Sequence, residues 1–284
     1  KHHKIKTRSK DETIFERILH LIEEVIPSGE NLGAIGIAAP GPLNPRTGII
    51  LNTPNIPAWE NFPVVEKLNA HFHVPVFLGN DANLAALGEW RYGAGQGHDH
   101  LLYLTISTGV GGGVISDGHL LEGRDGLAAE LGHVTILAEG PICGCGHKGH
   151  LEALSSGTAI AKYVKEQLKD ETTESSLRSS ASRSAKAIAK AARKGDPLAL
   201  SAYQRAGKYL GIGIASFLHI FNPSIVILGG GVSQSEDLLC KPFRESLQKE
   251  IFAPAYLEEL TITIAALGDD AGLLGALALV EQKV

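Results

Sequence analysis

Residues 130–152 carry the densest set of chemically active side chains in the sequence. After E-L-G-H and a short apolar V-T-I-L comes C-G-C-G-H-K-G-H-L-E, so that eighteen residues hold four soft metal ligands: His133, Cys143, Cys145 and His150. Two thiolates and two imidazoles are the ligand set of a closed tetrahedral zinc site, and the intervening glycines allow the tight turns that convergence requires. The alternative is a glycine-rich surface loop with reduced cysteines and solvated histidines. The upstream His133, and His150 five residues after Cys145, favour zinc.

A second polar group lies where an apolar run gives way to an expected helix. Asn80 and Asp81 follow the run P-V-F-L-G and precede A-N-L-A-A-L. Ligands of α/β sheets bind at the carboxyl ends of strands, where a carboxylate can accept a proton from a substrate hydroxyl and an amide can both donate and accept. Alternatively, Asp81 only caps the helix, and spacing alone leaves both interpretations open. Glu130 and Glu152 flank the zinc segment, which would hold them at fixed positions.

Two glycine-rich stretches are candidates for binding phosphate. Residues 107–113 read S-T-G-V-G-G-G and offer successive backbone N–H groups and two hydroxyls, as anion-binding nests do. A hairpin turn needs one glycine, so the four present favour a phosphate role, although no G-K-[ST] follows and the stretch is not a Walker A loop. Residues 229–231 read G-G-G after an apolar run and would let a ligand lie against the backbone.

Composition limits the class of protein. The chain has 284 residues, 44% of them hydrophobic, a net charge of −5 and a mean hydropathy of +0.05, which fits one large or two ordinary soluble domains. The basic residues 1–10 lead directly into a helix and are interpreted as a strand end and turn, so we expect no nucleic-acid partner. No apolar run approaches the ~18 residues of a membrane span. Three cysteines, one of them isolated at Cys240, argue against a disulfide framework and for a reducing cytoplasm.

The hydrophobic periodicity predicts strands that alternate with helices, which is typical of an α/β protein with mixed sheets. Helices are expected at residues 13–26, 63–72, 81–90, 156–168, 185–193, 198–221, 236–251 and 271–280. Strands are expected at residues 33–39, 48–51, 75–78, 101–106, 114–115, 134–137, 224–228 and 260–265. Residues 101–115 are expected to form a hairpin with the glycine-rich stretch as its turn, and the boundary between two halves is expected near residues 95–101.

Taken together, these residues resemble the ROK family of sugar kinases and repressors over nearly the whole chain. The family pattern is E-x-G-H followed by C-x-C-G-x-x-G-C-x-E, and the one departure is His150 in place of the third cysteine, which keeps a good zinc ligand. The resemblance implies that the sugar is contacted by Asn80, Asp81, Glu130, His133 and Glu152, with Asp81 as the general base. It also implies that His133 ligates zinc through one ring nitrogen and faces the sugar through the other.

The resemblance further implies the fold and the cofactors. The fold would be the actin-like ATPase fold, of hexokinase and ribonuclease H-like type, with a cleft between two domains. Residues 1–100 and the last helix, 270–284, would form the smaller domain, and residues 101–269 the larger one. ATP, with Mg²⁺, would be bound by Ser107, Thr108, Gly109, Gly111, Gly229, Gly230 and Gly231, and Zn²⁺ would be structural. The expected partners are a hexose and ATP, and the expected assembly is a homodimer or homotetramer.

Three functions follow from this resemblance. The first is an ATP-dependent hexose kinase that converts glucose to glucose 6-phosphate. The second is a transcriptional repressor with a sugar as effector, and the third is an inactive sugar-binding protein. The sequence leaves open whether the sugar is glucose, mannose, fructose or an N-acetyl sugar, whether the donor is ATP or polyphosphate, and whether the loop at residues 52–62 helps to choose.

One family motif, an opening hairpin with D-x-G-G-T that holds the ATP phosphates and magnesium, is not found in the printed chain. The chain also contains no methionine. We therefore expect that the sequence begins inside a longer protein, where the third strand of the family would lie.

A protein that starts at Lys1 should accordingly bind sugar weakly and transfer phosphate negligibly, because ATP would meet only residues 107–113 and 229–231. The measurement compares glucose phosphorylation by this protein with that by one extended by its upstream coding sequence. Equal rates would mean that the hairpin is dispensable or that the resemblance misleads.

Overall fold

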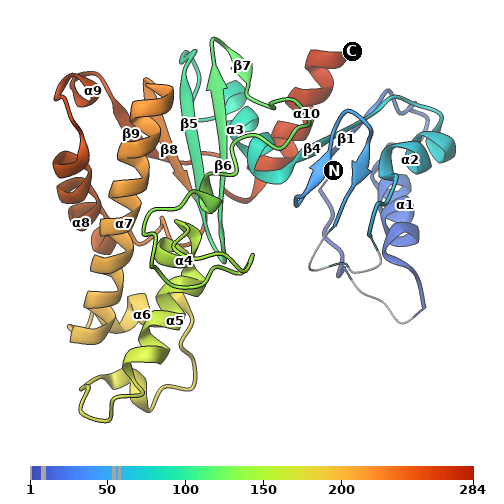
Figure 1. The fold of residues 1–284 in the computed structure, drawn as a ribbon. Helices are drawn as coiled ribbons and strands as arrows, with labels where there is room; N and C mark the ends of the chain where they lie inside the picture. Colours follow the sequence, from blue (N-terminus) through green and yellow to red (C-terminus); the bar gives the residue numbers. More distant parts are fainter. Residues whose placement is uncertain (1, 8–10, 53–55, 57–58) are drawn as a thin grey trace.

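The fold was analysed in a computed structural model that describes residues 2–7, 11–52, 56 and 59–284. The expected strand end and turn at residues 1–10 and the expected loop at residues 52–62 lie partly outside the described residues. The described chain forms two α/β parts that meet at a pair of helices (Figure 1).

The N-terminal part is built on a two-stranded parallel sheet. Its elements are α1 (Ile14–Val25), β1 (Ile35–Ala39), β2 (Leu43–Asn44), β3 (Ile49–Ile50), α2 (Val64–Phe72) and β4 (Val76–Asn80). Strand β1 pairs with β4, with Ile35 opposite Val76, and β2 pairs with β3 in a short antiparallel hairpin. Helix α1 begins at a capping box in which the Thr13 and Glu16 side chains each bond the other's backbone N–H, and its apolar side chains pack against the core of this part.

The C-terminal part is built on a five-stranded mixed sheet in the order β7-β6-β5-β8-β9. The strands are β5 (Leu101–Ile106), β6 (Val110–Ser116), β7 (His119–Leu120), β8 (Ile225–Gly229) and β9 (Thr261–Ile264). The helices and 3₁₀ turns are η1 (Leu131–His133), α4 (Glu152–Ser155), α5 (Gly157–Gln167), η2 (Ser176–Arg178), α6 (Ala185–Ala192), α7 (Pro197–Phe221), α8 (Glu236–Glu250), α9 (Ala255–Glu258) and η3 (Gly268–Asp270). No helix within the described ranges has both the length and the apolar character needed to cross a membrane.

Helices cover both faces of this sheet, and the side chains of β5 alternate between them. Leu102, Leu104 and Ile106 face the core shared with α5, α6, α7 and α8. Leu101 and Tyr103 face the core shared with α3 (Asp81–Tyr92) and α10 (Ala271–Lys283). A strand buried on both faces needs an apolar side chain at nearly every position, which explains the continuous run L-L-Y-L-T-I.

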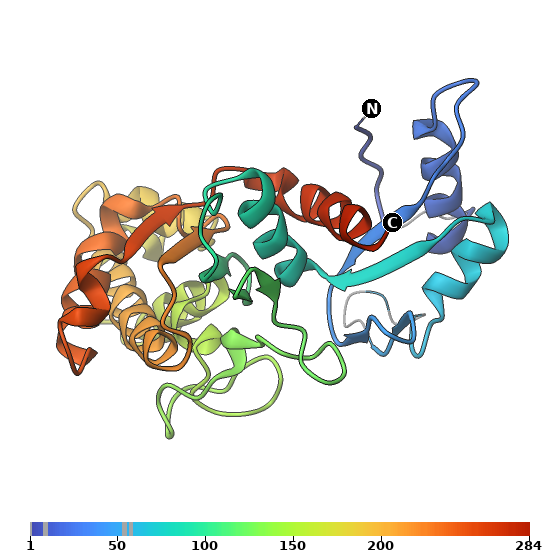
Figure 2. The same cartoon turned by 90° about the horizontal axis from the view of Figure 1, so that it is seen from above.

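Helices α3 and α10 lie side by side between the two sheets (Figures 1 and 2). Their backbones touch: a Cβ atom at Gly88 would lie 2.4 Å from the carbonyl oxygen of Ala271, and one at Gly275 would lie 1.7 Å from that of Leu84. Helix α10 also packs on β1, because a Cβ at Gly36 would lie 2.4 Å from the Ala276 carbonyl oxygen. The last helix therefore contacts both parts, and α3, which precedes residue 100, packs on the sheet of the C-terminal part.

The structure corrects two expectations about local structure and adds a short helix. Residues 111–113 lie inside β6 rather than in the hairpin turn, and their glycines leave room for the neighbouring elements: a Cβ at Gly113 would lie 2.5 Å from the Ala86 Cβ, and one at Gly111 2.8 Å from the Ala82 Cβ. Gly111 and Gly113 thus allow α3 to pack closely on β6, and Gly112 makes room for Leu131 of η1. Residues 134–137 form no strand, and only Thr135 makes a bridge, to His150. Helix α4 was not expected, since it is a single turn.

The helix crossing predicts a selective effect on stability. Gly275→Ala places a methyl group inside the Leu84 backbone, so we expect a loss of ~1–3 kcal/mol or more of unfolding free energy. Gly272→Ala on the same helix is the control, because its nearest neighbour would be the Ala38 Cβ at 3.9 Å and alanine favours a helix. Thermal unfolding followed by circular dichroism measures both; equal melting temperatures would contradict the crossing.

Candidate functional site

The end of β4 and the start of α3 present two polar side chains to a pocket. Asn80 is the N-cap of α3, and its Oδ1 accepts hydrogen bonds from the N–H groups of Ala82 (2.9 Å) and Asn83 (3.1 Å). Asp81 is the first helical residue, and its Oδ1 accepts from the N–H of Ala82 at 2.8 Å. Since Asn80 already caps the helix, capping does not account for Asp81. In the described part of the chain, no hydrogen bond engages its second oxygen.

A 3₁₀ turn supplies the opposite wall. Turn η1 begins after Glu130, and the N–H of His133 donates to the Glu130 carbonyl at 3.0 Å. Side chains three residues apart eclipse each other in a 3₁₀ helix, so Glu130 and His133 project on the same side. The turn lies directly on β6, because a Cβ at Gly132 would fall 1.9 Å from the Val110 carbonyl oxygen. Ala129, just before it, has a left-handed φ of +63°, a strained conformation of the kind found at functional sites.

These groups converge on one pocket between the two parts of the chain. It is lined by Gly41, Pro42, Asn80, Asp81, Ala82, Gly111, Gly112, Leu127, Ala128, Ala129, Glu130 and His133. Gly41 lies between the two walls, since a Cβ there would be 3.1 Å from the Asn80 Nδ2 and 3.5 Å from the Glu130 Oε1. The pocket thus combines carboxylates, an amide and an imidazole, which suits a ligand with several hydroxyl groups.

Partial desolvation changes the acidity of both pocket carboxyls, although Asp81 and Glu130 each keep exposed surface. It raises the pKa of Asp81, against the opposing hydrogen bond from Ala82. It also raises the pKa of Glu130, where the nearby charges of Asp81 and Glu152 add to the effect and His133 opposes it. A carboxylate with a raised pKa is a stronger base, and it is therefore better suited to take a proton from a hydroxyl.

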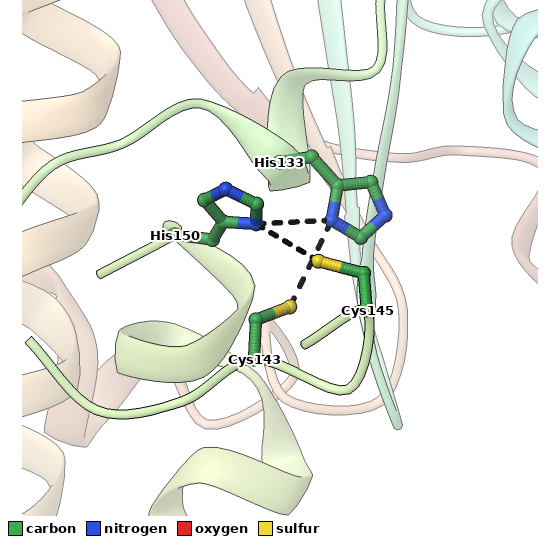
Figure 3. Close-up of side chains that lie close together, drawn as sticks. All are labelled: His133, Cys143, Cys145 and His150. Carbon is green, nitrogen blue, oxygen red and sulfur yellow. Dashed lines mark hydrogen bonds between the residues drawn. The ribbon is translucent and has the colours of Figure 1, made fainter. Parts of the chain in front are cut away.

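Next to this pocket, the four expected metal ligands lie together (Figure 3). The ligand atoms of His133, Cys143, Cys145 and His150 all lie within 4.8 Å of one another. The two Nδ1 atoms are 3.4 Å apart, the Cys145 Sγ is 3.3 Å from the His150 Nδ1, and the Cys143 Sγ is 3.8 Å from the His133 Nδ1. A tetrahedral zinc ion with ordinary bond lengths would separate two nitrogens by about 3.3 Å and a sulfur from a nitrogen by about 3.6 Å. The donor set therefore fits zinc in chemistry and in size.

Neighbouring groups tune the ligands and connect them to Glu152. Burial raises the pKa of the Cys143 thiol to about 12, whereas a hydrogen bond with the His147 backbone lowers that of Cys145 to about 7. Glu152 accepts from the Cys143 thiol at 3.2 Å through Oε1 and from the Val110 N–H at 3.2 Å through Oε2. Its carboxylate thus joins the metal cluster to the β5–β6 turn. Glu152 does not line the pocket, so its contact with sugar stays a prediction.

A second cavity lies on the other side of the β5–β6 turn. Its lining residues are Ser107, Thr108, Gly157, Thr158, Ala161, Ser184, Ala185, Lys186, Ala189, Arg193, Tyr203, Gly231, Val232, Gln234 and Ser235. The start of α5 faces this cavity, where the N–H of Gly157 donates to the Ser107 carbonyl at 2.8 Å. The N–H groups of Thr158 and Ala159 are also engaged, by the Thr108 carbonyl at 3.4 Å and the Ser156 hydroxyl at 3.0 Å, so the start of α5 offers a phosphate its helix dipole rather than free donors.

The residues expected to bind ATP do not all line the same cavity. Ser107, Thr108 and Gly231 line the second cavity, whereas Gly111 lines the first pocket. Gly229 packs against the Tyr103 hydroxyl, Gly230 against the Ile106 carbonyl and Gly109 against the Glu152 carboxylate. Their contacts with nucleotide stay predictions. Sequence reasoning did not single out Thr158, Lys186, Tyr203 or Gln234, because no local motif marks them and only the packing of α5, α6 and α7 brings them together.

Proteins of similar sequence and fold indicate the class to which this protein belongs. A glucokinase of Thermotoga maritima is 41% identical over 276 residues, which are 96% of this chain and 86% of that protein. A crystal structure of a ROK family glucokinase from Streptomyces griseus, in complex with glucose and AMPPNP, is 36% identical with a TM-score of 0.79 and covers 95% of this chain and 88% of that one. The xylose repressor of Bacillus spizizenii is 32% identical over 99% of this chain and 70% of the repressor. The architecture is that of the actin-like ATPases, as the resemblance implied.

The model of the ROK family matches residues 1–283, and the chain belongs to this family.

If the cluster binds zinc, a variant that lacks one ligand should lose both stability and sugar affinity. Cys145→Ser removes one thiolate ligand, so zinc should be lost, and because structural zinc contributes folding energy, the melting temperature should drop. The affinity for glucose should fall as well, since His133 and Glu130 lose their anchor. Elemental analysis, thermal unfolding and calorimetric titration measure the three effects. Cys240→Ser is the matched control, since Cys240 lies outside the cluster; well under one zinc per chain in the freshly purified, unmutated protein would refute the site.

Proposed function

We propose that the protein is an ATP-dependent hexose kinase that converts glucose to glucose 6-phosphate. The observation that carries this proposal is the position of Asp81: its carboxylate faces the pocket with one oxygen free of hydrogen bonds in the described chain, next to Asn80, Glu130 and His133. The similarity to two proteins named as glucokinases supports glucose as the sugar.

In the proposed reaction, Asp81 accepts the proton of the sugar hydroxyl while that oxygen attacks the γ-phosphate of ATP. Phosphoryl transfer needs mainly positioning and the neutralisation of charge, and a well-placed base adds a further factor. Asn80, Glu130 and His133 hold the other hydroxyls, so that the reacting one is directed at Asp81. The turn between β5 and β6 borders the second cavity and strand β6 borders the first pocket, so we place the crossing of the phosphate at this hairpin.

We assign ATP to the cavity lined by Ser107, Thr108 and Gly231. The lining includes the hydroxyl-bearing residues Ser107, Thr108 and Thr158, which suit phosphate oxygens. Lys186 and Arg193, which also line the cavity, add positive charge. Mg²⁺, when bound with ATP, would neutralise charge on the phosphates.

Zinc has a structural role in this proposal. Four protein ligands fill a tetrahedral ion, which leaves no open position for a substrate. His133 directs Nδ1 at the cluster, so its Nε2 is free for the sugar pocket that His133 lines. The cluster would therefore fix the imidazole that contacts the sugar.

The second candidate function is a sugar-responsive repressor, which the similarity to xylose repressors favours. A repressor would bind the sugar in the same pocket without turning over ATP, as would an inactive sugar-binding protein.

For the kinase, free thiols in the cluster suit a cytoplasmic location. We propose that it forms a homodimer or homotetramer and has no nucleic-acid or membrane partner. Coupled assays of ATP turnover with a panel of hexoses separate the kinase from both alternatives.

Asp81→Asn tests the kinase proposal. The amide keeps the size and can still donate to a hydroxyl, but it cannot take a proton, so kcat should fall by roughly 10²–10⁴ while the Kd for glucose changes far less. Because the pKa of Asp81 is raised, kcat/KM of the unmutated enzyme should decline on acidification above the ordinary aspartate value of ~3.9, and this decline should weaken in the variant. Steady-state kinetics across pH measure both. Near-normal kcat in the variant would leave Asp81 without a catalytic role.

A further inference from the structure

Two loops from opposite parts of the chain meet beside the sugar pocket. One is the β2–β3 turn, which is separated from the pocket residue Pro42 only by the two residues of β2. The other is the loop at residues 121–129, whose last three residues line the pocket. Because the loops belong to different parts of the molecule, their contact bridges the two walls of the pocket.

The first bridging contact is made by Arg46 at the tip of the β2–β3 turn. Its guanidinium donates to the carbonyl oxygen of Gly123 at 3.2 Å, across 77 positions in the sequence. The turn has its own internal hydrogen bonds, because the Asn44 Oδ1 accepts from the N–H groups of Arg46 (3.0 Å) and Thr47 (3.1 Å). Arg46 is exposed, so the hydrogen bond stands at the edge of the pocket rather than in a core.

The second bridging contact is made by Pro45 against Gly126. A Cβ at Gly126 would lie 2.1 Å from the Cδ of Pro45 and 2.3 Å from its Cγ, so only glycine allows the ring to rest there. Gly126 also has a φ of +75°, which glycine adopts without strain. It is buried although residues on both sides are not, so the ring covers it.

The bridged loop leads directly into the pocket wall. Three residues after Gly126 comes the strained Ala129, and Glu130 follows it. Movement of the loop would therefore displace Glu130 and the apolar rim at Leu127. A sugar held between Asp81 and Glu130 would be released when the two loops part.

We infer that Pro45 and Arg46 form a latch with Gly123 and Gly126 that closes the pocket on the bound hexose and sets its dissociation rate. This inference rests on the proposed sugar site. Arg46 is a positioning residue here, since it acts through the loop that carries Glu130 and touches neither substrate.

The test compares Arg46→Ala with Arg124→Ala. Arg124 lies in the same loop and is exposed, and it pairs only with its neighbour Asp125 at 2.7 Å among the described residues. Loss of a charge-assisted hydrogen bond should speed glucose dissociation and raise the Kd for glucose by about tenfold in Arg46→Ala. Arg124→Ala should stay within about twofold of the unmutated protein. Arg46→Lys, which keeps a donor, should recover part of the affinity.

Stopped-flow and calorimetric measurements of glucose binding read out the effect. In the active enzyme the KM for glucose should rise while the KM for ATP stays within about twofold, a split that general loss of structure would not give. Gly126→Ala, which pushes the Pro45 ring away, should weaken glucose binding at least as much. Unchanged glucose dissociation in both Arg46→Ala and Gly126→Ala would overturn the latch. Failure of the unmutated protein to bind any hexose would instead overturn the proposed function, and the latch with it.

Discussion

The close crossing of α3 and α10 is the constraint on which the rest of the structure depends. Asp81 starts α3, so its position relative to both sheets is set by how that helix packs, and bare backbone contact at Gly88 and Gly275 leaves little freedom. A buried carboxylate strengthens this arrangement: Glu89, with no exposed surface, accepts from the N–H groups of Ala94 (2.9 Å), Ala266 (3.1 Å) and Leu267 (2.8 Å). These three N–H groups belong to the segments that leave α3 and enter α10, so one side chain ties both connections together.

The pocket is assembled from elements that would otherwise be independent. The end of β4 contributes Asn80 and Asp81, and the 3₁₀ turn on β6 contributes Glu130 and His133. The metal cluster joins the second group to α4, because His133 and His150 meet there and Glu152 follows two residues later. Desolvation raises the pKa of Glu130, and the nearby charges of Asp81 and Glu152 add to the rise. A neutral sugar with many donors, as proposed for this pocket, would relieve this repulsion by hydrogen bonding to the carboxylates.

Local sequence signals were enough to predict most of the secondary structure and the grouping of the four candidate metal ligands. Helix α7 lies one residue from its expected start, since Asp196 caps it and Pro197 occupies its first turn. The metal ligands were found because Cys143, Cys145 and His150 are close in sequence. The extent of β6 was misjudged because Gly111, Gly112 and Gly113 make room for Ala82, Leu131 and Ala86, and such close packing leaves no mark in the neighbouring residues. The cavity proposed for the nucleotide, the Glu89 contacts and the Arg46–Gly123 bond join distant segments, and only the folded chain reveals them.

The central claim is that a hexose lies with its reacting hydroxyl against Asp81, and a crystal structure with glucose tests it most directly. The account predicts glucose in the pocket lined by Asn80, Glu130 and His133, with its 6-hydroxyl oxygen about 2.6–3.2 Å from a carboxylate oxygen of Asp81. Glucose bound elsewhere, or bound in this pocket with the 6-hydroxyl directed away from Asp81, would contradict it.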